Sequence, residues 1–204
     1  SAGFALTLYA TSGLRTWSAG LPVERPLDLF WSSGLAAVGE GIVALSAMAS
    51  YEPLLLRVGA DGTIEANVEL PTRISTVALR SLPGGGAVSA GTASRDPAPA
   101  DRSEDLVVAR HGPALDEVWR GYAKGPGSRF DQAQGLALGT DRVCLSGASS
   151  WPGASWESAT QAVCWDLDGD LLWSRVVAGP TAESHASAVA LSSAGELAVA
   201  SAPY

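Results

Sequence analysis

The sequence is poor in basic residues, in aromatic residues and in long apolar runs. Its 204 residues include 13 Lys and Arg against 21 Asp and Glu, which gives a formal net charge of −8. A protein that binds nucleic acid normally carries a basic face, so we expect no nucleic-acid partner. The longest apolar runs, such as residues 54–56, are far shorter than the roughly 18 residues that indicate a membrane helix. We therefore expect no membrane insertion.

Histidine and cysteine are also scarce, with two residues of each. Cys144 and Cys164 form no CxxC pair, so the sequence predicts no zinc site. The three glycines at 84–86 fall in an expected hairpin turn and do not open a helix, as a phosphate-binding loop would. The acidic stretch at 166–170 has its glycine at the fourth position and lacks the Glu of a calcium loop, so it reads as a hairpin turn. We expect no metal and no cofactor.

What the chain does contain is 47% hydrophobic residues, 23 Gly and 12 Pro. This length and apolar fraction are enough for a sizeable core. Gly, Pro, Ser and Thr interrupt each apolar run before about 10 residues, and alternation with a period of two dominates. The sequence therefore predicts an all-β chain, organised as a single domain over residues 1–204.

Two kinds of hairpin alternate along the chain. The first kind, built of small and apolar residues around a tight turn, occupies residues 34–50, 76–94, 135–150 and 188–204. The second kind occupies residues 4–17, 54–70, 106–120 and 161–177. Three hairpins of the second kind end on Trp17, Trp119 or Trp173, and Ala66 stands at the matching place in the other. We expect these tryptophans to pack between neighbouring repeats.

One hairpin of each kind makes a unit of about 45 to 55 residues, the length of a four-stranded propeller blade. The chain then forms a small β-propeller of four blades, at 34–70, 76–120, 135–177 and 188–204 plus 4–17. The last blade joins the N- and C-terminal strands and so leaves no exposed sheet edge. A β-sandwich would also have many short strands but would not explain the alternation or the split repeat. A fragment of a larger ring is a further alternative.

Residues 161–177 followed by 188–201 resemble the SBBP-type and delta-60-type repeats of bacterial β-propellers. The Asp-Gly turn of those repeats is intact at Asp61-Gly62 and Asp168-Gly169 but becomes Ser12-Gly13 near the N-terminus, and blade two has an irregular turn at 112–115. The resemblance implies a secreted or envelope-attached protein, extracellular, periplasmic or at the cell surface. It implies no catalytic residues.

Cys144 and Cys164 face each other across the expected hairpin of the third blade if its loop is centred near Ala154. Directly opposed residues approach the spacing of a disulfide, and two buried thiols are the alternative. The extracytoplasmic location implied by the resemblance favours the disulfide.

We label the strands of each blade A to D. The A–B and C–D turns are short, whereas the B–C and D–A connections are expected to be long and to lie together on one face. Function tends to reside in such loops. An aromatic face there could stack on a sugar, and polar groups could bind hydroxyls or a protein partner. The candidate ligand-binding residues are Trp31, Tyr122, Asp131, Trp151, Trp156 and Glu157. The alternative is that Trp151 and Trp156 cover the blade edge.

The sequence thus predicts a non-catalytic binding module for a carbohydrate or a protein partner. A structural or assembly domain of a larger surface protein is the first alternative. An enzyme acting on a polysaccharide or peptide is the second, and it is disfavoured because His111 and His185 are expected on opposite faces.

Overall fold

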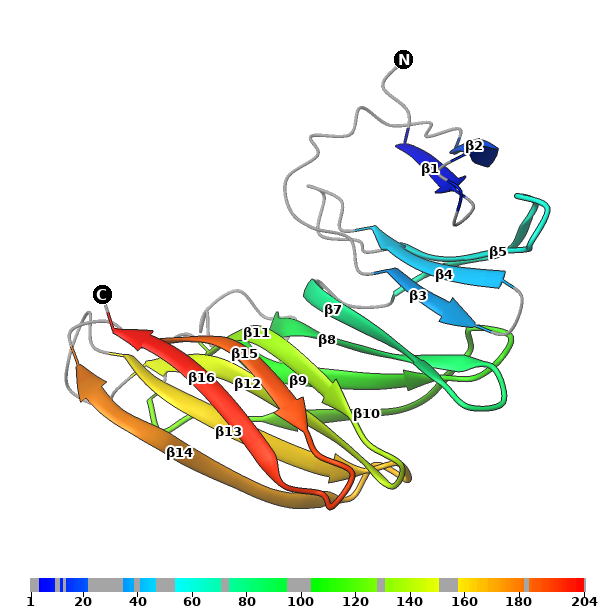
Figure 1. The fold of residues 1–204 in the computed structure, drawn as a ribbon. Coiled ribbons are helices and arrows are strands. Elements are labelled where there is room, and N and C mark those ends of the chain that lie inside the picture. Colours follow the sequence, from blue (N-terminus) through cyan, green and yellow to red (C-terminus); the bar gives the residue numbers. More distant parts are fainter. Residues whose placement is uncertain are drawn as a thin grey trace.

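The computed structural model of the chain consists of β-strands joined by turns and connections (Figure 1). It describes residues 4–9, 12, 14–21, 35–38, 41–46, 54–70, 74–94, 104–127, 131–150, 158–181 and 184–203. These residues form sixteen strands and include no helix. The all-β prediction is confirmed.

Three sheets have four strands each, and we name them blades 1 to 3. Blade 1 contains β3 (Leu35–Val38), β4 (Gly41–Ser46), β5 (Leu54–Val58) and β6 (Ile64–Glu69). Blade 2 contains β7 (Ile74–Leu82), β8 (Gly86–Ser94), β9 (Glu104–His111) and β10 (Glu117–Ala123). Blade 3 contains β11 (Asp131–Leu138), β12 (Arg142–Ser150), β13 (Ser158–Asp166) and β14 (Leu171–Thr181). In each blade the strands pair in chain order, from A to D.

The inner strands relate one blade to the next. β3 contacts β7, β7 contacts β11, and β11 contacts β15. The A strand of each sheet therefore lies against the A strand of the following sheet. This is how the blades of a propeller are arranged around a common axis.

Two further sheets contain only two strands. The N-terminal hairpin is β1 (Phe4–Tyr9) with β2 (Arg15–Leu21), and the C-terminal hairpin is β15 (Ser184–Leu191) with β16 (Leu197–Pro203). They lie at opposite ends of the structure, because the three blades stacked in chain order separate them (Figure 1). The expected last blade, joined from both hairpins within one chain, is not present among the described strands.

The repeat is visible in the backbone as well as in the sequence. The A–B pairs carry a register shift at Thr76/Ala78 in blade 2, at Ala133/Gly135 in blade 3 and at Ala186/Ala188 in the C-terminal hairpin. The C–D pairs carry one close to the C–D turn. It lies at Arg57/Val58 in blade 1, at Glu117/Trp119 on the D strand of blade 2, at Cys164/Trp165 in blade 3 and at Leu8/Tyr9 in the N-terminal hairpin. Bulges at a recurrent place are specific structural features. They mark the C-terminal hairpin as an A–B unit and the N-terminal hairpin as a C–D unit.

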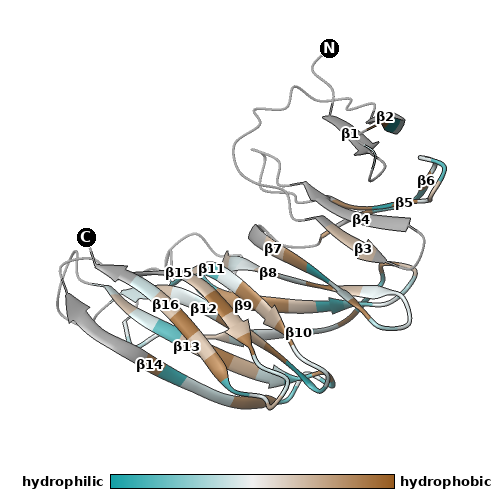
Figure 2. Ribbon diagram, viewed as in Figure 1, coloured by the Kyte–Doolittle hydropathy of each residue, from teal (hydrophilic) through white to brown (hydrophobic). Residues whose placement is uncertain are grey.

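The core lies between the blades. One cluster joins Leu106 and Val108 of blade 2 to Leu136, Leu145 and Trp165 of blade 3, and a second cluster joins blade 1 to blade 2. Figure 2 shows the corresponding apolar segments on the inner and middle strands, with polar residues toward the turns. Burial of these apolar faces is the main force that holds one blade against the next.

Trp119 at the D strand of blade 2 packs as the sequence predicts. Its indole Nε1–H donates a hydrogen bond of 2.8 Å to the carbonyl oxygen of Leu167, in the C–D turn of blade 3. A Cβ placed on Gly169 of the same turn would lie 3.0 Å from the Trp119 ring. The glycine, with φ of 101°, gives both the turn geometry and the room for the indole.

The predicted disulfide is confirmed. Cys144 on β12 and Cys164 on β13 are directly opposed in the strand register and bonded to each other, with a Cα–Cα distance of 4.1 Å. The described residues contain no free cysteine.

The connections differ from the expectation in one respect. The B–C connections are long, since β8 ends at Ser94 and β9 begins at Glu104, and β12 ends at Ser150 and β13 begins at Ser158. The D–A connections are not uniformly long, because β14 ends at Thr181 and β15 begins at Ser184. The strands are longer than the sequence predicted, because the backbone hydrogen bonds between strands continue through the polar residues at the strand ends.

Candidate functional site

The B–C and D–A connections leave the sheets at the same end of each blade, which we name the long-loop end. Two predicted site residues lie there in the described structure, Tyr122 at the end of β10 and Asp131 at the start of β11. Both lie in strands, not in the connection to which the sequence assigned them. The other predicted residues, Trp31, Trp151, Trp156 and Glu157, fall outside the described residues.

A buried polar cluster forms the floor of the long-loop end. Its side chains come from the strand ends of blades 2 and 3, and each is less than 5% exposed: Thr92, Asp105, Asp131, Ser149, Thr160 and Gln161. Of these residues, the sequence indicated only Asp131 as a candidate site residue. The signal for the others was the run of Ser, Thr, Gln and Asp at the loop-side ends of strands whose middles are apolar.

Asp131 is a carboxylate that is 3% exposed. Its Oδ2 accepts a hydrogen bond of 2.5 Å from the backbone N–H of Gly125. The Ser149 hydroxyl is close, but it has a single proton and donates it to Oε1 of Gln161. Asp131 Oδ1 therefore has no donor among the described residues. A buried polar atom without a partner is uncommon in folded proteins and calls for an explanation such as a bound water, an ion or a functional role.

Burial raises the pKa of Asp131 above its ordinary value. The Gly125 N–H opposes this rise, the negative charge of Asp105 adds to it, and Lys124 reduces it. Burial likewise raises the pKa of Glu104, at the start of β9. The long-loop end thus gathers acidic groups, and a ligand that donates hydrogen bonds or carries positive charge would complement it.

Gln161 ties the cluster together across blade 3. Its side-chain amide donates to the Ser174 hydroxyl at 2.8 Å and to the Lys124 carbonyl at 3.3 Å, while its Oε1 accepts from Ser149. This network links β12, β13 and β14 to the connection that carries Lys124. Such a network stabilises the strand ends of blade 3.

Tyr122 lies at the long-loop end of β10. Its half-buried ring packs with Ala93 and Val107, and its hydroxyl is 3.5 Å from a guanidinium nitrogen of Arg120. Part of the Tyr122 surface stays accessible at the long-loop end.

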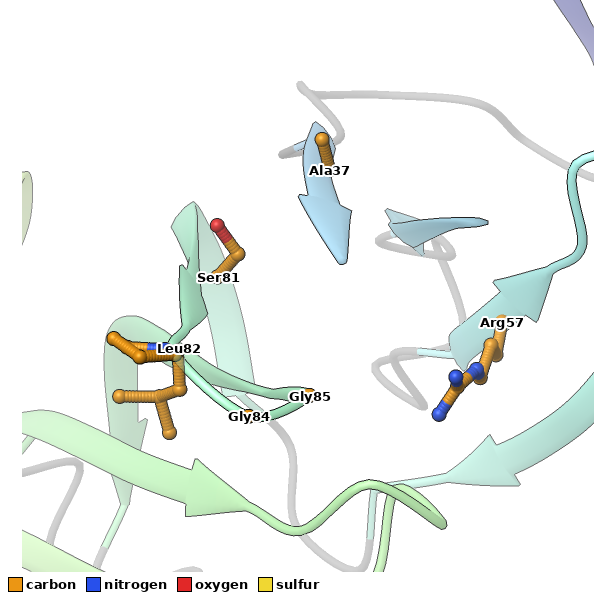
Figure 3. Close-up of a pocket in the computed structure, with 7 residues that line it drawn as sticks. Ala37, Arg57, Ser81, Leu82, Gly84 and Gly85 are labelled. Atoms are coloured by element: carbon orange, nitrogen blue, oxygen red, sulfur yellow. The ribbon is translucent and has the colours of Figure 1, made fainter. Parts of the chain in front are cut away.

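In the part of the chain that the structure describes, two open pockets that the sequence did not predict lie at the opposite end of the blades. One, of about 570 Å³, lies between blades 1 and 2 and is lined by Arg57 and by the A–B turn at 81–85 (Figure 3). The other, of about 500 Å³, lies among the A–B turns of blades 2 and 3 and the C-terminal hairpin. Ser81 and Pro83 line both pockets. Residues of different sheets line each pocket, and no local sequence pattern encodes such a meeting of turns.

The charged groups at these pockets are already engaged. Arg57 forms an ion pair of 2.9 Å with Glu65 and donates a hydrogen bond to the Pro113 carbonyl. Arg142 pairs with the adjacent Asp141 at 2.8 Å. Surface ion pairs of this kind contribute little energy.

The two histidines do not form a site together. His111, at the short-turn end of β9, is fully buried, and its Nε2 lies 2.9 Å from the Ser89 hydroxyl. Burial lowers the pKa of His111 to about 4. His185 lies in β15, near the start of the strand at the long-loop end.

Within the part of the chain that the structure describes, no group of three or more His, Cys, Asp or Glu side chains could hold a metal ion. In the same residues there is no helix of the length and apolar character needed to cross a membrane.

The comparisons with known proteins identify the fold. The WD40 domain of Neurospora crassa Pan2 matches 92% of this chain with a TM-score of 0.58 at 13% sequence identity, and the chain covers 49% of that domain. WD40 repeats build propellers. The fold is β-propeller-like. A Synechocystis apocarotenoid oxygenase mutant (TM-score 0.45, 10% identity, 83% of this chain and 44% of that one) and puromycin hydrolase (TM-score 0.37, 16% identity, 87% and 38%) are also similar.

This propeller-like chain spans about half the length, or less, of the solved structures that it matches. No protein-family model matches it, and no curated protein is significantly similar to it in sequence. The resemblance to SBBP-type and delta-60-type repeats therefore stays a sequence-based prediction at the level of the family.

Proposed function

We propose that this propeller is a non-catalytic binding module that acts outside the cytoplasm and holds its ligand at the long-loop end. The ligand is a protein partner or a carbohydrate. The observation that carries the proposal is the buried acidic floor at this end, where Asp131 has one carboxylate oxygen without a donor among the described residues. The long B–C connections of blades 2 and 3 start at the edges of this floor.

A protein partner is supported by the fold, because propellers present loops on a rigid scaffold and function in many proteins as interaction surfaces. A carbohydrate is supported by the residue types in the connections, since Trp151 and Trp156 accompany Glu157. The disulfide between Cys144 and Cys164 is compatible with an extracellular, periplasmic or cell-surface location.

Two variants of the chain test the site. Binding to a glycan array and to a displayed peptide library is measured for the unmodified chain, for the Trp151→Ala, Trp156→Ala double variant and for Asp131→Asn. A residue that anchors a ligand contributes more than about 1 kcal/mol, so we expect each variant to lose roughly tenfold in affinity.

Leu14→Ala is the matched control, because Leu14 is 72% exposed at the short-turn end. It should bind as the unmodified chain does. Equal affinity of all variants would remove the long-loop end from the site, and loss of binding in the control alone would place the site at the opposite end. Binding to sugars or to peptides decides between the two ligand classes.

We further propose that the chain contributes four blades to its propeller, with the last blade formed from the N- and C-terminal hairpins. The matching bulges support this, because one hairpin is an A–B unit and the other a C–D unit. The alternative function is that of a structural or assembly domain of a larger surface protein.

A further inference from the structure

We infer that the pocket among the A–B turns of blade 2, blade 3 and the C-terminal hairpin binds the free carboxyl terminus of a peptide whose last side chain is apolar. We name it the three-turn pocket, and its volume is about 500 Å³. The inference goes beyond the proposed function, because it assigns a second ligand to the end of the blades that lies opposite the long-loop end.

Turns of three successive sheets bound the three-turn pocket. The lining residues are Ser81 and Pro83 from blade 2, residues 138–142 from blade 3 and residues 191–195 from the C-terminal hairpin. These turns meet because β7 contacts β11 and β11 contacts β15. The volume lies within the range of about 300 to 1,000 Å³ that is typical of small-ligand sites. A hollow of this size between turns accepts the end of a peptide, whereas the middle of a chain would also need an exit.

Arg142 supplies positive charge and free donors to this pocket. Its Nε and Nη2 donate to the two carboxylate oxygens of Asp141, at 2.9 Å and 2.8 Å. This pairing occupies one edge of the guanidinium and leaves the N–H groups of Nη1 on the other side. Nη1 has no hydrogen-bond partner among the described residues, and the side chain is 32% exposed. The N–H groups of Nη1 are therefore available to a ligand.

The guanidinium lies beside the turn of the C-terminal hairpin. A Cβ placed on Gly195 would be 3.7 Å from Arg142 Cζ and 3.8 Å from Nη1. Gly195 has a φ of 80° and closes its turn by donating its N–H to the Ser192 carbonyl oxygen at 3.0 Å. Because this turn position has no side chain, residue 195 does not cover Nη1.

Hydroxyl groups add further donors to the pocket. Ser192 and Ser193 line it together with Arg142. The Ser192 Oγ accepts the backbone N–H of Glu196 at 3.0 Å, so the hydroxyl proton remains available to a ligand. Asp141 is the one carboxylate among the described lining residues, and Arg142 binds both of its oxygens. The lining thus offers more donors than acceptors, and a ligand carboxylate complements it in charge and in hydrogen bonding.

Each of the three turns also contributes an apolar side chain to the lining: Pro83, Leu138 and Leu191. A Cβ placed on Gly139 would lie 3.5 Å from Leu191 Cδ1, so the turns of blade 3 and the C-terminal hairpin are in close contact here. An inorganic anion would leave these apolar side chains without a partner, and a basic ligand would meet the positive charge of Arg142. A peptide that ends on an apolar residue places an aliphatic group next to a carboxylate. Capture of a terminal carboxylate is a recurring mode of peptide recognition.

A short synthetic peptide tests the site on the full chain. The probe is N-acetylated glycine-serine-glycine-leucine with a free carboxyl terminus, and its binding is followed by chemical-shift changes in the NMR spectrum of the isotope-labelled chain. We expect a dissociation constant below about 1 mM. The same peptide with a C-terminal amide should bind at least about tenfold more weakly, because it loses hydrogen bonds to a charged group. A peptide that ends on glycine should also bind more weakly, because it leaves the apolar lining empty.

Variants of the chain locate the contact. Arg142→Gln removes the guanidinium, and Ser193→Trp fills the pocket from an exposed turn position. Each should weaken binding of the free-acid peptide by at least about tenfold, with circular dichroism confirming that the variant is folded. Arg175→Gln is the matched control, because Arg175 is exposed on β14 and does not line the pocket. Asp131→Asn should leave binding of this peptide unchanged, because Asp131 lies at the long-loop end.

Four outcomes would overturn the inference. Equal affinity for the free acid and the amide would refute carboxylate binding, and equal affinity of Arg142→Gln and Arg175→Gln would remove Arg142 from the site. Unchanged binding by Ser193→Trp would place the peptide elsewhere. An amidated peptide with an internal aspartate that binds as tightly as the free acid would refute the carboxyl terminus as the ligand. A dissociation constant above about 1 mM for the free-acid peptide would likewise refute the site.

Discussion

The contact between Gly121 and Trp165 sets how closely blade 2 approaches blade 3, and it can be tested by adding a single methyl group. Trp165 is 1% exposed in the core between these blades. A Cβ on Gly121 would lie 2.6 Å from its Nε1, 3.0 Å from its Cδ1 and 3.1 Å from its Cε2. A fully buried ring has no free direction in which to move, so Gly121→Ala must shift the two blades apart or force Trp165 off its rotamer.

The expected cost follows from measured overpacking. Insertion of a methyl group into a well-packed core costs about 1 to 3 kcal/mol, and the smaller backbone entropy of alanine returns about 0.5 kcal/mol of this. We expect Gly121→Ala to lower the free energy of unfolding by about 2 kcal/mol, which corresponds to a drop in Tm of about 4 to 8 °C for a chain of this length. Urea unfolding followed by tryptophan fluorescence and thermal unfolding followed by circular dichroism measure both quantities.

Gly139→Ala is the control, because its nearest atom, the Arg142 carbonyl oxygen, is 3.5 Å from the added carbon. It should change stability by less than about 0.5 kcal/mol. The double variant Gly121→Ala, Trp165→Phe should lose less stability than the sum of the losses of the two single variants, because the smaller ring relieves the clash. Equal stability of Gly121→Ala and Gly139→Ala would refute the assignment of this contact as the spacer between the blades.

Three further predictions concern the remaining groups. Replacement of both Cys144 and Cys164 by Ala should lower the free energy of unfolding by about 3 kcal/mol in urea titration, because the bond closes a loop with a sequence separation of 20; a loss below about 1 kcal/mol would contradict this. His111 has its pKa lowered to about 4 in the folded state. Between about pH 6.5 and 4 the unfolded chain therefore binds a proton at His111 that the folded chain does not, so the free energy of unfolding should fall as the pH drops through this range. Urea titrations across this range should show a shallower fall for His111→Gln, and parallel curves would contradict the assignment. Asp131 has a raised pKa, so its charged form is disfavoured by folding at neutral pH, and Asp131→Asn should leave thermal stability at pH 7 unchanged or higher while ligand binding falls; clear destabilisation would show that the carboxylate is structural.

Much of the architecture was readable from local patterns. The Asp-Gly turn at Asp61-Gly62 and the turn at 84–86 place glycines where the structure has positive φ angles, which only glycine adopts without strain. The opposed positions of Cys144 and Cys164 followed from counting residues back from the loop, since strand pairing in a hairpin is symmetric about its turn. Trp119 was correctly assigned to packing between blades because it recurs at one place in the repeat.

The candidate site was only partly readable. Asp131 was singled out by its place in a connection, but its burial and its orphaned oxygen depend on Gly125, Ser149 and Gln161, which come from three different segments. The two pockets at the short-turn end escaped the sequence analysis altogether, because they exist only where turns of neighbouring blades meet. The length of the D–A connections was misjudged because the strands run on through their polar ends.

By itself the sequence determined the strands, their order within each blade and the two hairpin types, because these depend on residues close together in the chain: alternation, turn glycines and bulges. The tertiary structure alone decided how the blades are arranged. The angle between neighbouring blades depends on side-chain volumes across each interface, such as the space that Gly121 leaves for Trp165. That angle sets the curvature, and the curvature, not the repeat, keeps the two terminal hairpins apart.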